Sequence, residues 1–258
     1  MRKYALLALL LVCQPVAAHS PLLFCYELQE KSTLKTSLGV GLEQIFEFQA
    51  RIVTDALESL AMPYQLQRLP WRRCLAAVNR GELDGAIGVG WTAERDSAYH
   101  FPRSQLELDP SKRLLHLNYS IYTRYDSPLQ WDGQQLTGIQ HGLAAPKGYV
   151  AEQRLQQLGV WRELDTALDS GIDLVLKHRL DGYVLPDEVA AAQLKGHSEA
   201  DKIRKLEPRF MAQPLYLVLS RKSSKLDDER RAQLWQQIEL SREKLLGQHS
   251  QQSTPEQH

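Results

Sequence analysis

The sequence predicts an α/β protein that is divided into two lobes. Strand-like and helix-like patterns alternate as β-α-β-α-β through the first part of the chain, an order typical of a parallel sheet covered by helices. A second alternating series begins at Leu136. The segment Arg80–Ile87 also resembles Lys177–Val184, and each carries Leu-Asp-Gly ahead of an apolar run. This repeat favours two similar lobes, although Asp-Gly is a common turn dipeptide and coincidence stays open.

The first series of elements follows from apolar spacing and from turn residues. Leu22–Tyr26 is a short apolar run that predicts a strand, and the polar segment 30–41 predicts a loop. Apolar residues recur every three or four positions over Leu42–Leu60, which predicts an amphipathic helix. Alternation of apolar and polar residues predicts a strand at Tyr64–Leu69. Pro70 and Gly81 then bound a helix, and the series closes with Trp71–Asn79 as helix and Leu83–Val89 as strand.

The rest of the chain gives a longer series by the same reasoning. We expect strands at Arg113–Tyr125, Leu136–Ala145, Trp161–Leu164, Leu180–Leu185 and Pro214–Ser220. We expect helices at Tyr149–Leu158, Ile172–His178, Asp187–Leu194 and Asp227–Leu246. The tail 247–258 is rich in Gln and Ser and is predicted to be disordered.

Residues 1–18 have the composition of a secretory signal peptide. Arg2 and Lys3 precede the apolar run Tyr4–Val12, and small residues end the segment at Ala18. The run is too short to cross a bilayer, which needs about 20 apolar residues. A buried N-terminal strand or helix is the alternative. Because no later run reaches membrane length and no cysteine follows a lipoprotein-like motif, we expect an exported, soluble protein without a lipid anchor.

Two cysteines, Cys25 and Cys74, remain after removal of the signal peptide. In an oxidising compartment such a pair indicates one disulfide, worth about 4 kcal/mol in the chain-entropy model. Two buried thiols are the alternative. A metal site is not expected, because no histidine lies at ligand spacing from either cysteine.

The charge balance gives no electrostatic signature of nucleic acid or of anionic membrane binding. Lys and Arg number 31, as do Asp and Glu, and loss of the signal peptide makes the chain slightly acidic. A local basic patch is still compatible with this balance. Phosphate-loop, Gly-x-Ser-x-Gly and His-Glu-x-x-His motifs are absent from the sequence, so we expect no cofactor, no metal and no enzymatic activity.

Several short motifs follow one another in a characteristic order. The first part carries Leu-Pro-Trp-Arg-Arg-Cys-Leu from Leu69, Gly-Glu-Leu-Asp-Gly-Ala from Gly81, Trp-Thr-Ala-Glu-Arg from Trp91, and Phe-Pro from Phe101. The second part adds Gly142–Tyr149 and Leu-Asp-Gly-Tyr-Val, the latter followed closely by Asp-Glu. In this order, over about residues 20 to 245, the chain resembles the periplasmic solute-binding protein family 3 of amino-acid ABC transporters.

The resemblance implies a type II periplasmic binding protein fold, with two α/β lobes joined by hinge strands. Lobe 1 would comprise 19–120 and 212–246, lobe 2 would comprise 121–211, and the hinge strands would lie near Ser120–Arg124 and Leu215–Ser220. It implies a monomer that closes around a small polar ligand. The implied partners are that ligand and an inner-membrane ABC permease or a membrane sensor.

Arg95 is the first candidate for contact with the ligand. In relatives, the arginine of the Thr-x-Glu-Arg motif holds the ligand's α-carboxylate, because its planar fork donates two parallel hydrogen bonds. A surface ion pair is the alternative. Relatives place serines seven and five residues earlier, where this chain has Gly88 and Gly90. Gly90 can still offer its backbone N–H, but the departure argues against a standard amino-acid ligand.

The remaining candidates come from both predicted lobes. Lys147 precedes a helix N-terminus that attracts anions, and solvation is the alternative. Asp187 is the candidate for a ligand ammonium, although Asp also favours the N-cap position of a helix. Aromatic walls of the cleft, with core packing as the alternative, are predicted at Trp71, Trp91, Tyr149 and Tyr26.

Three functions are compatible with these residues. The first is delivery of a small polar solute to a transporter, and the second is ligand sensing in the periplasm. The third is an enzyme on the same scaffold that resembles cyclohexadienyl dehydratases, for which Glu27 or Glu94 would act as the acid–base group. No motif supports either glutamate in that role.

Overall fold

The computed structural model describes residues 20–27, 39–164, 170–195 and 197–252. The predicted signal peptide and the last six residues lie outside this part of the chain. Helices are α1 (Gly39–Ser59), α2 (Trp71–Arg80), α3 (Ala93–Ala98), α4 (Val150–Gln157), α5 (Gly171–Leu176), α6 (Asp187–Leu194) and α7 (Asp228–Gln252), with short 3-10 turns at Pro110–Lys112 and Ala200–Lys202.

Thirteen strands are present in the described residues, nine of them in one central sheet. The sheet order is β10-β11-β7-β13-β3-β1-β2, with β12 beside β7 and β4 beside β13. The bounds are β1 Leu22–Glu27, β2 Tyr64–Leu69, β3 Gly85–Gly90, β4 Tyr99–His100, β5 Arg103–Ser104, β6 Glu107–Leu108, β7 Leu115–Arg124, β8 Gln130–Trp131, β9 Leu136–Thr137, β10 Leu143–Ala144, β11 Gly182–Pro186, β12 Ile203–Lys205 and β13 Met211–Ser220.

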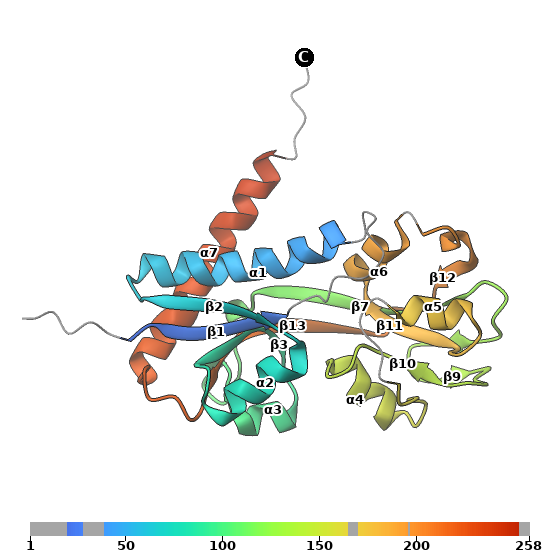
Figure 1. Ribbon diagram of the computed structural model, residues 1–258, viewed down its shortest axis with the longest axis horizontal. Helices are drawn as coiled ribbons and strands as arrows, with labels where there is room; N and C mark the ends of the chain where they lie inside the picture. The colour runs from blue at the N-terminus through green and yellow to red at the C-terminus, as the bar shows by residue number, and fades with distance from the viewer. Residues whose placement is uncertain (1–19, 28–38, 165–169, 196, 253–258) are drawn as a thin grey trace, which may run out of the picture.

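The sheet is shared by two lobes, which Figure 1 shows side by side. The first lobe holds the parallel strands β1, β2 and β3, with α1 and α7 on one face and α2 and α3 on the other. The second lobe holds the parallel pair β10 and β11 with α4, α5 and α6. The antiparallel strands β7 and β13 connect the lobes, and they pair with each other over Leu115–Tyr119 of β7. Beyond this region β7 pairs with β11 of the second lobe, and β13 pairs with β3 of the first. The exact lobe boundaries stay a prediction.

Long-range contacts reshape several of the predicted elements. The predicted strand Leu136–Ala145 divides into β9 and β10, because Gly138 and Gly142 take positive φ angles of 75° and 84° that break an extended run. Trp161 contributes only a single bridge to Leu143. Helix α7 continues to Gln252, past the predicted end at Leu246, while α3 and β12 were not predicted at all.

The repeated Leu-Asp-Gly segments have the same structural role in both lobes. In the first lobe, the Asp84 N–H donates to the Leu23 carbonyl at 2.7 Å, and the Asp84 carboxylate accepts from the Leu23 N–H at 2.7 Å. In the second lobe, Asp181 makes the same pair of bonds with Gly142, at 3.0 and 2.8 Å. Each aspartate thereby fixes the start of the neighbouring parallel strand. This shared role argues that the repeat is not a coincidence.

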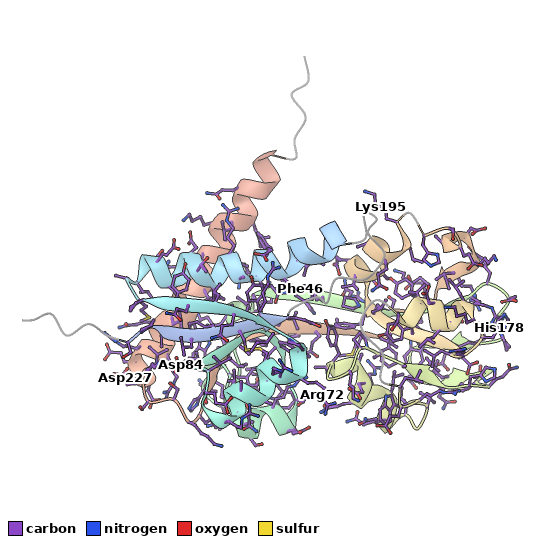
Figure 2. All side chains as sticks on the ribbon, in the orientation of Figure 1. Phe46, Arg72, Asp84, His178, Lys195 and Asp227 are labelled. Carbon is purple, nitrogen blue, oxygen red and sulfur yellow. A yellow bond between two sulfur atoms is a disulfide. The ribbon has the colours of Figure 1, made fainter. Side chains whose placement is uncertain are left out.

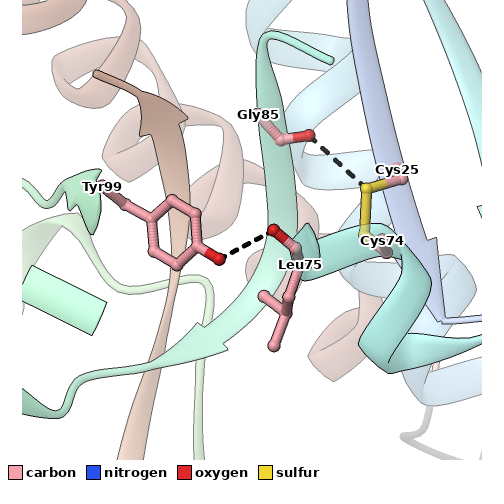
Figure 3. Close-up of a disulfide and its surroundings, with 5 residues drawn as sticks. All are labelled: Cys25, Cys74, Leu75, Gly85 and Tyr99. Carbon is pink, nitrogen blue, oxygen red and sulfur yellow. Dashed lines mark hydrogen bonds between the residues drawn. A yellow bond between two sulfur atoms is a disulfide. The ribbon is translucent and has the colours of Figure 1, made fainter. Parts of the chain in front are cut away.

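A disulfide joins Cys25 of β1 to Cys74 of α2, as Figure 3 shows. The two Cα atoms are 5.7 Å apart, and both side chains are fully buried within the first lobe. The cross-link holds α2 against the sheet. Because Trp71 begins α2, the bond also fixes the position of this side chain at the border between the lobes.

Candidate functional site

A cavity of about 40 Å³ lies where the two lobes meet. Figure 2 places Phe46 of α1 and Arg72 of α2 near this border. Strands β1, β3, β7 and β13 supply its floor, and helices from both lobes supply its sides. Most of the lining is aliphatic or aromatic with a few polar groups, a composition typical of small-molecule sites. The lining residues are Glu27, Ile45, Phe46, Gln49, Trp71, Ile87, Gly88, Gly90, Arg95, Leu117, Tyr119, Tyr149, Val150, Pro186, Val189 and Leu215.

Arg95 lies at one wall of the cavity and contacts both lobes. Thr92 caps α3 by accepting a hydrogen bond from the Arg95 N–H at 3.2 Å. This cap fixes the backbone of Arg95 in the first turn of the helix. The Nη1 atom donates to the Gly90 carbonyl at 2.8 Å, and Nη2 donates to the Gly148 carbonyl of the second lobe. Burial lowers the pKa of this guanidinium, which nevertheless stays charged at neutral pH.

The Gly148 carbonyl is a shared acceptor at the interlobe border. It accepts from Arg95 and also from the Trp71 indole N–H, at 3.2 Å. Gly148 has a φ of 83°, and a Cβ here would lie 3.3 Å from Arg72 Cγ and 3.4 Å from Trp71 Cδ1. A glycine therefore suits both the left-handed backbone and the close approach of the two lobes.

A second interlobe hydrogen bond joins Tyr149 to Glu27. The Tyr149 hydroxyl donates to Glu27 Oε2 at 2.6 Å. Burial raises the pKa of the Glu27 carboxyl to about 7, and the bond from Tyr149 opposes part of that rise. Burial also raises the pKa of Tyr149 well above its ordinary value, so this phenol remains a proton donor.

The two glycines at the serine positions of the relatives have side chains of other elements beside them. A Cβ on Gly88 would lie 2.7 Å from Gln49 Oε1, and Gly88 has a φ of 88°. A Cβ on Gly90 would lie 2.8 Å from Val150 Cγ2 in the second lobe. The space beside the two glycines is thus taken by the amide of Gln49 and by an aliphatic contact across the cleft.

A polar chamber of about 330 Å³ lies on the other side of the Arg95–Gly148 contact. It is lined by α2, α3 and α4, and it shares Arg95 and Tyr149 with the inner cavity. Gln153 of α4 donates to Glu94 of α3 at 3.1 Å, which adds another bond between the lobes there. Arg95 therefore lines both an apolar inner cavity and a polar outer chamber, and a ligand in either one can reach it.

The structure brings together only some of the predicted site residues. Arg95, Trp71, Gly90 and Tyr149 all line the inner cavity, whereas Trp91, Lys147, Asp187 and Tyr26 do not.

The residues outside the inner cavity have other neighbours. Trp91 packs against the buried cluster around the disulfide, and Tyr26 accepts from Arg68 Nε at 2.9 Å beside a neighbouring groove. Asp187 accepts from the Tyr122 hydroxyl at 3.0 Å and from Lys205 at 3.5 Å. Asp187 is also the first residue of α6 rather than its N-cap, which is Pro186.

Several cavity residues were not identified as ligand contacts from the sequence. Gln49 interrupts the apolar face of α1, four residues after Ile45 and four before Val53, and that interruption was the available signal. Glu27 is the last residue of β1, at the carboxyl end of the strand, where ligands bind in open α/β sheets. Tyr119 lies within a long strand and carried no separate signal.

No group of His, Cys, Asp and Glu suited to a metal ion occurs among the described residues. Within the same ranges, no helix combines the length and the apolar character needed to cross a membrane.

Comparison with known proteins identifies the fold. No family model matches the chain, and no curated protein matches it in sequence. The arginine-, lysine-, histidine-binding protein ArtJ from Geobacillus stearothermophilus is similar in structure, with 13% identity, a TM-score of 0.61, and coverage of 90% of this chain and 91% of that one. A histidine kinase sensor domain with similarity to periplasmic binding proteins has 14% identity, a TM-score of 0.63, and coverage of 90% and 93%.

The GluR0 ligand-binding core from Nostoc punctiforme, in complex with L-glutamate, has 14% identity, a TM-score of 0.59, and coverage of 90% and 96%. At these identities the likeness concerns the fold. The chain has the two-lobed α/β fold of the periplasmic binding proteins, as the sequence predicted.

Proposed function

We propose that this chain is a periplasmic solute-binding protein that holds a small carboxylate, amino-acid-like or simpler, between its two lobes. Arg95 carries the proposal. Its guanidinium lines the inner cavity and donates to backbone carbonyls from both lobes, at Gly90 and Gly148. A carboxylate can accept two such donors at once with stronger, charge-assisted bonds. A ligand held there touches both lobes and thereby stabilises the closed form.

Delivery to an inner-membrane ABC permease is the role we propose for this binding activity. Structural similarity to amino-acid-binding proteins such as ArtJ supports it. The charge and apolar pattern of residues 1–18 supports export to the periplasm. A buried disulfide between Cys25 and Cys74 is consistent with an oxidising compartment.

A thermal-shift screen of the purified protein tests the proposal. The panel contains amino acids, simple organic acids, polyamines and sugars. We expect members with a carboxylate to raise the melting temperature, because a ligand that binds only the folded state stabilises it. The amide or alcohol of the same skeleton serves as the matched control and should have no effect. Stabilisation by uncharged compounds alone would contradict the role of Arg95.

A periplasmic sensor is a second candidate, favoured by the similarity to a histidine kinase sensor domain. In transport, ligand binding leads to uptake of the ligand, whereas in sensing it leads to a change in transcription. A strain that lacks the protein should lose uptake of the radiolabelled ligand if the chain serves a permease. Intact uptake combined with a lost transcriptional response would favour the sensor.

An enzyme on the same scaffold is a third candidate, because Glu27 combines a partly apolar setting with a raised pKa near 7. Such a carboxyl suits general acid–base chemistry. Incubation with prephenate and with arogenate tests this candidate directly. Turnover that the Glu27→Gln variant loses would support an enzyme, whereas binding without turnover would leave the solute-binding role.

A further inference from the structure

We infer that the ligand carries an uncharged hydroxyl group besides its carboxylate, and that the side-chain amide of Gln49 pairs with this hydroxyl in the inner cavity. The inference rests on the proposed function, in which Arg95 holds the carboxylate. It makes Gln49 a residue that determines specificity, and it narrows the ligand to the class of short hydroxy acids.

Gln49 is a buried polar side chain without an adequate partner. It is 1% exposed and lines the inner cavity. Its Oε1 atom has no hydrogen-bond partner among the described residues, and Nε2 has only a long bond of 3.5 Å to the Ile45 carbonyl. A buried polar atom that loses water without gaining a partner destabilises the folded protein. A polar group of the ligand beside this amide would remove that penalty.

Gly88 leaves the space that the amide of Gln49 occupies. Its φ is 88°, and a Cβ there would lie 2.7 Å from Gln49 Oε1. Any side chain at position 88 would therefore displace the amide oxygen. Because Gly88 and Gln49 both line the inner cavity, the pair places an amide group in the cavity wall, within reach of a ligand.

An amide and a hydroxyl group are complementary in both directions. The amide offers an acceptor at Oε1 and donors at Nε2, while a hydroxyl can donate one hydrogen bond and accept others. The pairing therefore holds whichever way the amide group of Gln49 is turned. A ligand carbonyl could only accept from Nε2, and it would leave Oε1 without a partner. A hydroxyl is the smallest group that can satisfy Oε1 and can also accept from Nε2.

The charges near the cavity favour a neutral group over a second cation. Arg95 lines the same cavity, and its side chain donates to two backbone carbonyls. Within the described ranges it forms no ion pair, so a cationic group of the ligand would meet a like charge. Asp187, the predicted acceptor for an ammonium, lies outside the cavity and is bonded to Tyr122 and Lys205.

Glu27 carries the only carboxyl group among the described residues that line the cavity. Tyr149 donates to it at 2.6 Å, and burial raises the pKa of this carboxyl to about 7. At neutral pH about half of the molecules therefore carry no charge at Glu27. The protonated carboxyl neutralises no cation, and it is compatible with a neutral hydroxyl nearby.

Aliphatic side chains cover much of the remaining lining. They come from both lobes and include Ile87, Leu117, Val150, Val189 and Leu215. Since these groups do not compete for the amide and keep water away from it, a hydrogen bond to Gln49 is stronger than it would be in water. A site whose buried polar group needs a ligand hydroxyl rejects the analogue that lacks it.

Two pairs of acids test this inference by calorimetry at pH 7. The first pair is 2-hydroxybutanoate and 2-methylbutanoate, and the second is 3-hydroxybutanoate and 3-methylbutanoate. Within each pair a methyl group of similar size replaces the hydroxyl. We expect the hydroxy acid of at least one pair to bind about tenfold more tightly than its methyl counterpart. The pair that shows this preference gives the position of the hydroxyl.

The outcomes separate this inference from the proposed function. If the members of both pairs bind equally, the hydroxyl inference is wrong while the carboxylate role of Arg95 stands. If 2-aminobutanoate binds more tightly than both hydroxy acids, the second group is a cation, and the inference is again wrong. If none of the acids binds, the inference falls together with the proposed class of small carboxylates.

Variants of Gln49 then locate the effect. Gln49→Met keeps the length of the side chain but has no amide, and it should weaken the preferred hydroxy acid by about tenfold while the methyl acid stays within about twofold of the wild type. The exposed control Gln157→Met should change neither affinity. Circular dichroism checks that the variants fold, and Gln49→Asn, which withdraws the amide by one methylene, decides the test if Gln49→Met does not. A hydroxyl preference that survives in the folded variant would overturn the inference.

Discussion

Substitution of Gly90 by alanine should obstruct closure of the lobes, because its tightest new contact is with the second lobe. The added Cβ would lie 2.8 Å from Val150 Cγ2, and 3.0 Å from Gln213 Cγ. Ordinary contacts between carbon atoms are about 3.5–4.0 Å long, so the second lobe must withdraw by about 0.7 Å or more. Gly90 is not among the glycines with positive φ, so alanine introduces no backbone strain at this position.

The cost of such overpacking is about 1–3 kcal/mol. Because Val150 belongs to the second lobe and Gly90 to the first, this cost falls on the closed form and appears as lost affinity. We expect about 5-fold to 150-fold weaker binding of the best carboxylate from the screen, measured by calorimetry. The free energy of unfolding, measured with urea, should change by less than about 1 kcal/mol.

Gly247→Ala is the matched control, because a Cβ there has no atom within 4 Å. Affinity of the Gly90→Ala variant within about twofold of the wild type would refute the reasoning. That result would mean that the ligand-bound form does not bring Val150 against β3.

Three further predictions concern stability, each measured by urea unfolding. Reduction of the Cys25–Cys74 disulfide, whose cysteines are 49 residues apart, should cost about 4 kcal/mol, and equal stability of both redox forms would contradict it. Asp181→Ala should cost about 3 kcal/mol, because three backbone N–H groups lose their acceptor, whereas the exposed Asp201→Ala should cost nothing measurable. Glu27 has a pKa of about 7 in the folded protein, against an ordinary value of 4.5. Below pH 4.5 its carboxyl is protonated in both the folded and the unfolded protein. Above that pH it ionises more readily in the unfolded protein, which lowers the stability of the folded state. As the pH rises from 4.5 to about 7, the wild type should lose up to about 3 kcal/mol relative to Glu27→Gln, and parallel pH profiles would contradict this.

Local patterns predicted most elements of the fold. The apolar period of α1, the Pro70 and Gly81 boundaries of α2 and the alternation of β2 depend on neighbours in sequence, and these elements lie close to where they were predicted. The short strands β9 and β10 were predicted as one, because the positive φ of Gly138 and Gly142 and the close approach of Pro128 and Val160 to these glycines are not visible in the local pattern.

The candidate site was less accessible to sequence reasoning. Arg95 could be found because its motif is local and because Thr92 caps the same short helix. The pairing of Asp187 could not be found in this way, because its partners Tyr122 and Lys205 are distant in the sequence and lie opposite each other on β7 and β12. The amide of Gln49 fits into the cavity wall because Gly88 has no side chain. These two residues are far apart in the sequence, so a single sequence does not reveal that they are neighbours.

The most direct test of the central claim is calorimetry of one carboxylate ligand from the screen with the wild type, Arg95→Ala and Arg179→Ala. Arg179 is exposed and precedes β11 in the second lobe, outside the residues that line the cavity. The account predicts that Arg95→Ala weakens binding by at least about tenfold, or about 1.4 kcal/mol, while Arg179→Ala binds as the wild type does. Equal affinity of all three proteins would remove Arg95 from the site and contradict the proposed function.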